Sequence, residues 1–301
     1  MAENSEAETR PSYIKRIERI NPEKQLTDVL TKKFGQKFSD YRKEYFKILD
    51  SKNNNYDHVP DYPLNVLVEV VNKCNLECIM CLSSHRKGDT KVISQDTISK
   101  LLTEFKENNL PALMFGAGDE PLMFSDIDQF WKEANSSGIM DIFIFTNGTL
   151  LNEDMCKKIL EHEVSRVYIS LDAATEETYQ QIRLTNNKIH DEVKNNQNLT
   201  ILNSKQNELQ SIENNIKRLI ELRNSRNLQL PQIRVSYTVQ SRNKHEIEMF
   251  KEKWQDVVDF IEFQETQNIQ FDNLAKLSET ERWKRRPPMY KENYKKDCKA
   301  P

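Results

Sequence analysis

Six short apolar segments, separated by segments of helical spacing, constrain the fold of this chain more than any other feature. Their apolar residues are continuous rather than alternating, which is typical of parallel strands covered on both faces. The segments between them place apolar residues three and four apart, and Ser94 is a candidate cap for one of these helices. This alternation predicts an α/β fold in which the crossover connections between parallel strands are right-handed. The apolar segments are residues 64–71, 112–116, 141–146, 166–171, 232–239 and 258–263.

The 301 residues divide into a main part and two flanking parts. Residues 1–61 are polar and predict a partly helical N-terminal extension. Residues 62–265 carry the strand and helix pattern, interrupted at 184–210 by a stretch rich in asparagine and lysine that we interpret as a flexible insertion. Residues 266–301 are predicted to form a linker. Within the extension an apolar helical stripe is expected to dock on the main domain, or alternatively to bind a partner; it consists of Phe38, Tyr41, Tyr45, Phe46 and Leu49.

Charge and cysteine usage narrow the class of protein. A net charge of -3, with 30% charged residues, provides no basic surface for nucleic acid. No apolar run is long enough to span a membrane, and the polar start has no secretory pattern, which predicts a cytoplasmic protein. Three of the five cysteines are clustered, so they do not form a disulfide framework. Clustered reduced thiols indicate metal or redox ligands.

Polar or glycine-bearing clusters follow five of the six predicted strands. Because the carboxyl ends of parallel strands meet at one edge of a sheet, these clusters are expected to build one site. They cover residues 74–81, 116–121, 146–149, 170–173 and 239–241.

The cysteine cluster has the spacing Cys74-x3-Cys78-x2-Cys81. Structural zinc takes four ligands, and ferredoxin-type clusters take four cysteines, whereas only three are local here. His85 could complete a Cys3His zinc site, and this alternative stays open. Three thiolates on a 4Fe–4S cluster would instead leave one iron with an open position, as catalytic metal sites require.

This cysteine spacing, followed by Gly118-Asp119-Glu120-Pro121, resembles the radical S-adenosylmethionine superfamily over about residues 62–265. The resemblance implies a partial (β/α)6 TIM-like barrel, a 4Fe–4S cluster on Cys74, Cys78 and Cys81, and S-adenosylmethionine as second cofactor. It implies that the reduced cluster cleaves S-adenosylmethionine and that a 5′-deoxyadenosyl radical then attacks the substrate. An electron donor such as flavodoxin or ferredoxin is implied as a partner. We expect a sugar-like small molecule rather than a peptide as substrate, because residues 1–61 show no strand-rich recognition module.

The resemblance also implies which residues contact S-adenosylmethionine. Asp119 stands where the family usually has a second glycine, and aspartate tolerates a left-handed backbone better than most residues. The implied contacts are Met80 with the adenine; Gly118, Asp119 and Glu120 with the amino group; Ser170 and Asp172 with the ribose; Arg183 with the carboxylate; and Gln240 at the end of the fifth strand.

Plainer interpretations exist for several of these residues. Asp172 could cap a helix at 175–183, and Asn147-Gly148 could be only a turn. Arg183 alone could be a surface arginine, and Cys156 is expected to be a buried helix cysteine.

Cys298 and Pro301 resemble the opening of the cysteine-rich extension of the SPASM subgroup. Either the chain is a fragment truncated at the start of that extension, or Cys298 is a tail thiol without a role. Two other classes stay open for the whole chain: an iron–sulfur electron-transfer or sensing protein without catalysis, and a zinc-stabilised binding protein.

Overall fold

The computed structural model describes most of the chain between residues 16 and 265. The described ranges are 16–20, 24–49, 60–81, 88–116, 118–185, 198–199 and 208–265. The strands are β1 Arg16–Ile20, β2 Asn65–Val68, β3 Leu76–Cys78, β4 Ala112–Phe115, β5 Asp141–Thr146, β6 Arg166–Ser170, β7 Arg183–Thr185, β8 Gln232–Val239 and β9 Phe260–Glu265. The helices are α1 Lys24–Phe34, α2 Gln36–Leu49, α3 Gln95–Glu107, α4 Ile127–Ser136, α5 Glu153–Glu161, α6 Glu176–Ile182, α8 Glu208–Ser225 and α9 Ile247–Trp254, with short 3-10 turns η2 Pro121–Met123 and η3 Lys244–Glu246.

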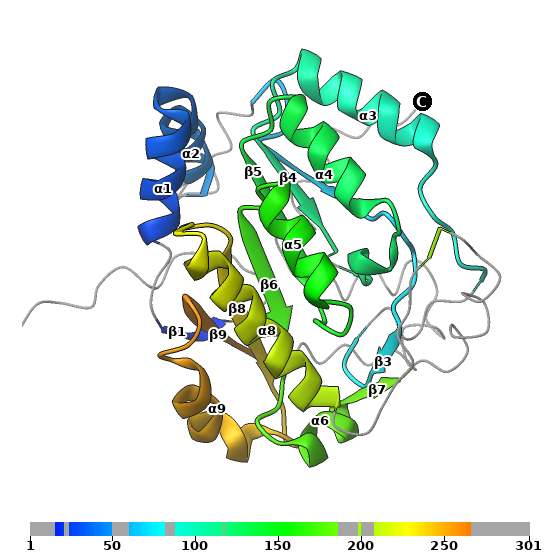
Figure 1. The fold of residues 1–301 in the computed structure, drawn as a ribbon, viewed down its shortest axis with the longest axis vertical. Coiled ribbons are helices and arrows are strands. Elements are labelled where there is room, and N and C mark those ends of the chain that lie inside the picture. The colour runs from blue at the N-terminus through cyan, green and yellow to red at the C-terminus, as the bar shows by residue number, and fades with distance from the viewer. Residues whose placement is uncertain are drawn as a thin grey trace, which may run out of the picture. The chain divides into compact units, whose positions relative to one another are not determined.

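The main sheet has the strand order β1-β9-β8-β6-β5-β4-β2. Six of these strands pair in parallel, namely β2, β4, β5, β6, β8 and β9. Strand β1 is an edge strand that pairs with β9 in the antiparallel direction. Each predicted apolar segment forms one of the six parallel strands, so the predicted α/β fold of a partial barrel is confirmed. Figure 1 shows the strands side by side, with the connecting helices packed against them.

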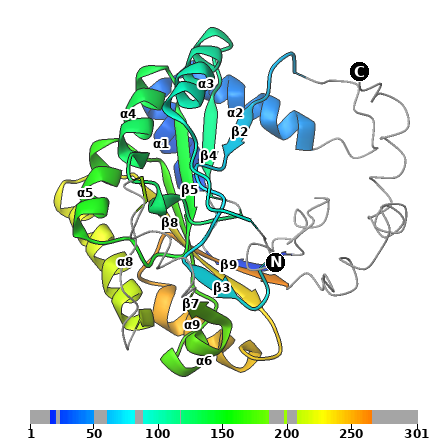
Figure 2. The ribbon, with the colours of Figure 1, turned by 90° about the vertical axis from the view of Figure 1, so that its right-hand side faces the viewer.

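The two faces of this sheet are covered differently because successive side chains of a strand point to opposite faces. In β5, Ile142 and Ile144 belong to the large core that the sheet shares with the outer helices. Phe143 belongs to a second cluster on the other face, and Phe145 packs against that cluster. Figure 2 shows α4, α5 and α8 along the outer side of the sheet. The continuous apolar strands of the sequence are thus explained by burial on both faces.

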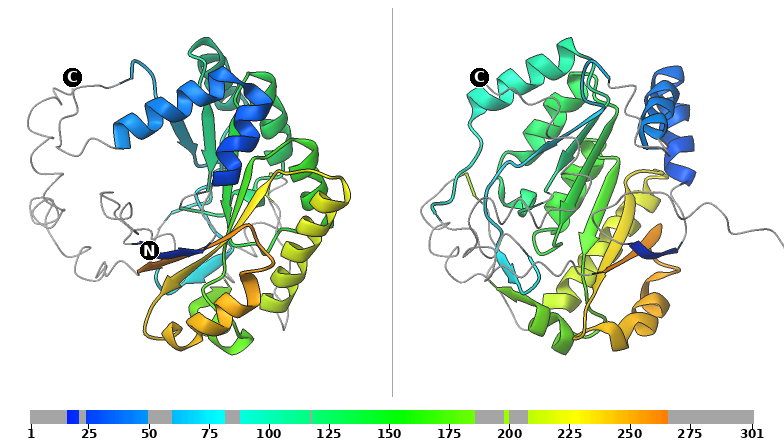
Figure 3. Two further views of the ribbon diagram at one scale, coloured as in Figure 1. Left: turned by 90° about the vertical axis from the view of Figure 1, so that its left-hand side faces the viewer. Right: turned by 180° about the vertical axis from the view of Figure 1, so that it is seen from behind.

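Helices α1 and α2 pack at the amino ends of the strands. Phe38 and Tyr41 of α2 are 0% and 7% exposed and join Tyr168 in the second cluster. The expected docking of the apolar stripe on the main domain is therefore confirmed for these two residues, while Phe46 is 37% exposed. Figure 3 shows α1 and α2 at the end of the sheet opposite β3 and β7. None of the described helices is long and apolar enough to cross a membrane.

Two features of the fold were not foreseen from the sequence. Residues 16–20 form β1 within the predicted helical extension, and β3 pairs with β7 in a separate two-stranded sheet. Thr185 still belongs to β7 and α8 already begins at Glu208, so regular structure enters both ends of the predicted insertion 184–210. The predicted linker 266–301 lies outside the described residues.

Candidate functional site

The cysteine loop leaves the sheet after β2 and is held by the small β3–β7 sheet. Cys78 lies opposite Arg183 in the antiparallel register of β3 and β7. The amide of Ile79 donates to the carbonyl of Ile182 at 3.0 Å, and the amide of Cys81 donates to the carbonyl of Cys78 at 3.0 Å. These bonds fix Cys78 and Cys81 on one turn beside the end of α6. Figure 1 shows β3 and β7 beyond the carboxyl end of β6.

The thiols of this loop lie in a poorly solvated environment. Burial raises the pKa of Cys74 well above its usual value, and the nearby Glu120 carboxylate raises it further. Burial raises the pKa of Cys78 to about 11, while the Arg183 guanidinium opposes this shift. At Cys74 and Cys78 burial thus favours the neutral thiol, and a bound cation would release the protons of these two groups.

The donor set of this loop is three cysteine thiols, Cys74, Cys78 and Cys81. Each thiolate can bind a separate iron of a 4Fe–4S core, so these residues fit that cluster. Within the described part of the chain, no three His, Cys, Asp or Glu side chains are grouped around a position for a single metal ion. His85, the fourth ligand of the alternative zinc site, lies outside the described residues.

Three side chains link the cysteine loop to the end of β5. Asn147 donates through Nδ2 to Oδ1 of Asn75 at 2.8 Å and to Sγ of Cys74 at 3.5 Å. Oδ1 of Asn147 accepts from the amide of Thr149 at 2.9 Å and from its Oγ1 at 2.6 Å. Asn75 donates through Nδ2 to Oγ1 of Thr149 at 2.8 Å. Asn147 is thus more than a turn residue. The roles of Asn75 and Thr149 were not predicted, although both stand inside the strand-end clusters of the sequence.

Glu120 joins this network from the end of β4. Its Oε1 accepts from Oγ1 of Thr146 at 2.7 Å and from the amide of Leu122 at 3.1 Å, and its Oε2 accepts from the amide of Asn147 at 2.7 Å. The side chain is 1% exposed, and burial raises its pKa to about 7 against these hydrogen bonds. The carboxylate therefore holds the ends of two strands together, and its predicted contact with a ligand amino group stays a prediction.

The loop before Glu120 turns at Gly116 rather than at Asp119. Gly116 has a φ of 76°, whereas Asp119 is not among the residues with positive φ. The left-handed backbone that we considered for Asp119 is therefore not needed, and this part of the sequence interpretation is wrong. The amide of Gly118 donates to Oε1 of Glu69 at 2.8 Å, and Asp119 is 8% exposed.

Asp172 and Arg183 form a buried ion pair beside the cysteine loop. Nε and Nη2 of Arg183 donate to Oδ2 of Asp172 at 3.1 and 2.6 Å, and Oδ1 of Asp172 accepts from the amide of Thr238 at 2.6 Å. The side chain of Arg183 is 6% exposed and that of Asp172 is 1% exposed, so Arg183 is not a surface arginine. The suggestion that Asp172 caps the following helix is also wrong, because Thr175 is the N-cap of α6. Burial lowers the pKa of Arg183, but the Asp172 carboxylate and other nearby groups raise it, so that the pKa of Arg183 lies above its usual value.

The remaining predicted residues lie around this centre with fewer contacts. Met80 is half-buried on the cysteine loop, and Ser170 is half-buried at the end of β6, in register with Ser236 of β8. The amide of Gln240 donates to Oδ1 of Asn243 at 2.8 Å, and among the described residues its buried Nε2 has no hydrogen-bond partner. Cys156 is fully buried in α5, as expected, and is not part of the site.

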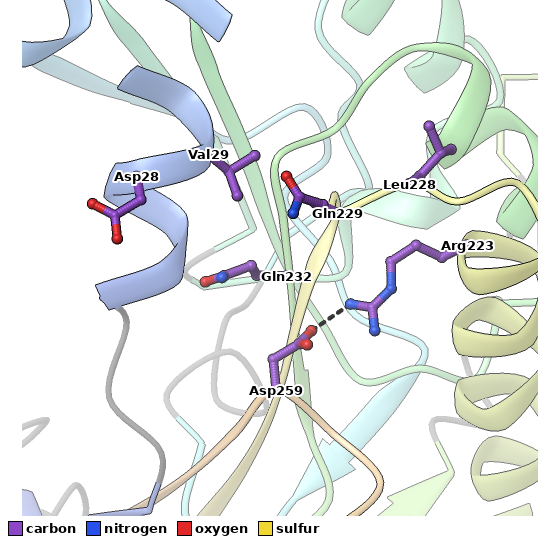
Figure 4. A pocket seen from close by; sticks show the side chains of 7 residues that line it. All are labelled: Asp28, Val29, Arg223, Leu228, Gln229, Gln232 and Asp259. Carbon is purple, nitrogen blue, oxygen red and sulfur yellow. Dashed lines mark hydrogen bonds and ion pairs between the residues drawn. The ribbon is translucent and has the colours of Figure 1, made fainter. Parts of the chain in front are cut away.

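A separate cavity of about 380 Å³ lies near the start of β8, between α1 and the end of α8 (Figure 4). Asp259 accepts from Nη1 of Arg223 at 2.5 Å and from the amide of Ile233 at 2.7 Å. No residue that we predicted for the site lines this cavity, so it is not the site indicated by the sequence. It is lined by Asp28, Val29, Arg223, Leu228, Gln229, Gln232 and Asp259.

Comparison with known proteins agrees with this geometry. A model of the Radical SAM superfamily matches residues 68–222, which include all three clustered cysteines and Arg183. The chain is 31% identical over 116 residues to 7,8-dihydro-6-hydroxymethylpterin dimethyltransferase of Methanocaldococcus jannaschii, covering 37% of this chain and 23% of that protein. It is 30% identical over 131 residues to GTP 3′,8-cyclase of Limosilactobacillus fermentum, covering 42% of this chain and 38% of that protein. The match therefore spans well under half of either relative.

Among solved structures, histidine-tagged anSMEcpe with bound AdoMet superposes with a TM-score of 0.50 at 18% identity. The superposition covers 68% of this chain and 50% of that one, and at this identity it indicates a shared fold only.

Proposed function

Because the chain belongs to the radical SAM superfamily, whose cofactors are a 4Fe–4S cluster and S-adenosylmethionine, we propose that it is an enzyme that cleaves S-adenosylmethionine reductively to modify a small molecule. Cys74, Cys78 and Cys81 would hold the cluster. When bound, the cluster supplies the electron that breaks the carbon–sulfur bond and so yields the 5′-deoxyadenosyl radical.

The observation that carries this proposal is the joining of the cysteine loop to three strand ends by buried polar contacts. Asn147 connects Cys74 to the end of β5, and Glu120 connects β5 to the end of β4. Arg183 lies opposite Cys78 and pairs with Asp172, which follows the end of β6. Such contacts orient ligands and exclude water from the site.

The Asp172–Arg183 pair supports a site for a zwitterionic ligand. Asp172 holds the guanidinium through Nε and Nη2, which leaves Nη1 as the nitrogen that can turn toward a ligand carboxylate. Arginine is suited to this role because it stays charged and carries five donors, so it can bind Asp172 and a ligand carboxylate at the same time. Ser170 and Asp172 remain our proposed contacts for the ribose and Met80 for the adenine. Gln240 remains a proposed cofactor contact at the end of β8.

For the substrate we propose a small molecule. The two relatives described above are named for reactions of a pterin and of GTP, and these names support a small heterocyclic or sugar-bearing substrate over a peptide. Membership of the SPASM subgroup is likewise a proposal, which rests on Cys298 and Pro301 in the sequence. A flavodoxin or ferredoxin would be the electron donor.

The test is reconstitution with iron and sulfide in the absence of oxygen. We expect a brown protein with about four iron and four sulfide per chain. Replacing Cys74, Cys78 and Cys81 by alanine should abolish the colour, whereas Cys156→Ala, which removes a buried thiol outside the loop, should retain it. Stoichiometric zinc without iron would overturn the proposal.

A second measurement separates catalysis from electron transfer. With dithionite and S-adenosylmethionine, the reconstituted protein should release 5′-deoxyadenosine and methionine slowly even without substrate. An intact cluster with no cleavage under these conditions would identify an electron-transfer or sensing protein instead.

A further inference from the structure

We infer that Asn147 is a positioning residue that donates a hydrogen bond to the sulfur of Cys74 and thereby raises the reduction potential of the cluster. This inference rests on the proposed function, since it concerns the same cluster. It assigns a role to the strand-end motif 146–149, which none of the implied cofactor contacts uses.

The orientation of the Asn147 amide follows from its partners. A backbone N–H can only donate, and the amide of Thr149 lies 2.9 Å from Oδ1 of Asn147. The oxygen of the side chain must therefore face Thr149, and the nitrogen must face Cys74. Its two hydrogens match two acceptors, Oδ1 of Asn75 at 2.8 Å and Sγ of Cys74 at 3.5 Å.

A closed ring of hydrogen bonds keeps the amide in this orientation. Thr149 donates through Oγ1 to Asn147, Asn147 donates to Asn75, and Asn75 donates back to Oγ1 of Thr149. Asn75 and Asn147 are 5% and 6% exposed, so water competes little for these groups. The backbone of Asn147 is also fixed, since its amide donates to Glu120. The donor is thus preorganised before any cluster binds.

A donor aimed at a ligand sulfur stabilises negative charge on the cluster. Reduction adds one electron, so the hydrogen bond favours the reduced form more than the oxidised form and raises the potential. The amide of Leu76 makes a second contact of the same kind, at 3.5 Å from Sγ of Cys74. Backbone amides survive substitution, whereas the Asn147 donor can be removed.

The experiment compares Asn147→Leu with Thr149→Val in reconstituted protein. Leucine has nearly the shape of asparagine but no donor. Valine breaks the same hydrogen-bond ring yet leaves the Thr149 amide that orients Asn147. By redox titration followed by electron paramagnetic resonance, Asn147→Leu should lower the equilibrium constant for reduction about three- to tenfold, or about 28–59 mV for one electron. Thr149→Val should stay within about twofold of wild type.

The outcomes separate this inference from the proposed function. Equal potentials in wild type and Asn147→Leu, or an equal shift in both variants, would overturn the role of Asn147 while leaving the cluster in place. A wild-type protein that assembles no cluster would refute the proposed function itself. If Asn147→Leu does not retain a cluster, wild-type protein labelled with ¹⁵N in its asparagine side chains decides the question. Hyperfine coupling of a side-chain nitrogen to the reduced cluster supports the contact, and its absence overturns it.

Discussion

Gly116→Ala is expected to destabilise the protein strongly, because two independent costs fall on one methyl group. Gly116 has a φ of 76°, a conformation that costs an L-residue about 1–2 kcal/mol. A Cβ at this position would lie 2.5 Å from Cδ and 2.6 Å from Cγ of Pro121, and it would also collide with the carbonyl oxygen of Phe145. Both neighbours are rigid, so the overlap should add about 1–3 kcal/mol.

Gly138→Ala is the matched control for this experiment. Gly138 also has a positive φ, 92°, but a Cβ there would have no neighbour within 4 Å. Both substitutions reduce the entropy of the unfolded chain equally. The control therefore isolates the backbone cost of about 1–2 kcal/mol, and the excess in Gly116→Ala measures the collision.

Urea unfolding of both variants and the wild type provides the measurement. We expect a loss of about 2–5 kcal/mol for Gly116→Ala, with an unchanged m-value. The same variant should also bind S-adenosylmethionine more weakly, because Gly116 begins the loop that carries Gly118 and Glu120. A loss of unfolding free energy no larger than that of Gly138→Ala would refute the argument, since it would mean that Pro121 and Phe145 can shift to make room for the methyl group.

Three further predictions follow from buried charges. The pKa of Glu120 is raised by burial from 4.5 to about 7, so folding stability should fall by about 3 kcal/mol as pH rises through this range, and Glu120→Gln should flatten this slope in pH-dependent urea unfolding. Glutamine should lower stability most at low pH, where its nitrogen cannot accept the hydrogen bonds that the protonated wild-type side chain accepts, and the difference should shrink as pH rises; an unchanged slope would contradict the assignment. Asp119→Gly and Asp119→Asn should each bind S-adenosylmethionine within about threefold of wild type in calorimetry, under roughly 0.7 kcal/mol, and a tenfold loss in both would show that the carboxylate contacts the ligand. Arg183→Ala should lower stability by about 3–5 kcal/mol because it leaves Asp172 buried and unpaired, and the double variant with Asp172→Asn should recover part of this loss; no recovery would indicate that the pair is not coupled. In folded Arg183→Ala, cofactor affinity should fall by about 1.5–3 kcal/mol.

The parallel sheet could be predicted from the sequence because it depends on a strong and local signal. A strand buried on both faces needs a continuous apolar run, and such runs stand out against the polar helical segments around them. The cap of α3 was equally local: Oγ of Ser94 accepts from the amide of Thr97 at 3.1 Å, as expected. β1 could not be predicted in this way. Residues 16–20 carry three charges among five residues, and the strand exists because the edge of β9 offers a partner far away in the sequence.

For the candidate site, residue types were easier to predict than their partners. The three cysteines are recognisable by spacing alone, and the strand-end rule brought residues 116–121 and 146–149 to the same edge. The ring through Asn75 and Thr149 could not be foreseen, because asparagine and threonine are common in turns and only three-dimensional contacts distinguish them from turn residues. The conformation of Asp119 was misjudged for the same reason. The positive φ was assigned to the residue that departs from the family pattern, whereas the chain turns three residues earlier, at Gly116.

Several described residues of the predicted insertion 184–210 contact the core domain. Leu184 and Thr185 extend β7, which starts at Arg183 opposite Cys78. Leu199 forms a bridge with Phe124, close to Glu120 in the chain, and the amide of Ser125 donates to the carbonyl of Asn198 at 3.1 Å. At the far end, the amides of Glu208 and Leu209 donate to the carboxylate of Glu176 at 3.1 and 3.0 Å. The described residues of this stretch therefore contact the cysteine loop through β7, the turn after Glu120 through Asn198 and Leu199, and α6 through Glu208 and Leu209. Because the β7 contact lies directly beside Cys78, we expect that deleting Leu184 and Thr185 would disturb the position of the cysteine loop, so these described residues belong to the core domain.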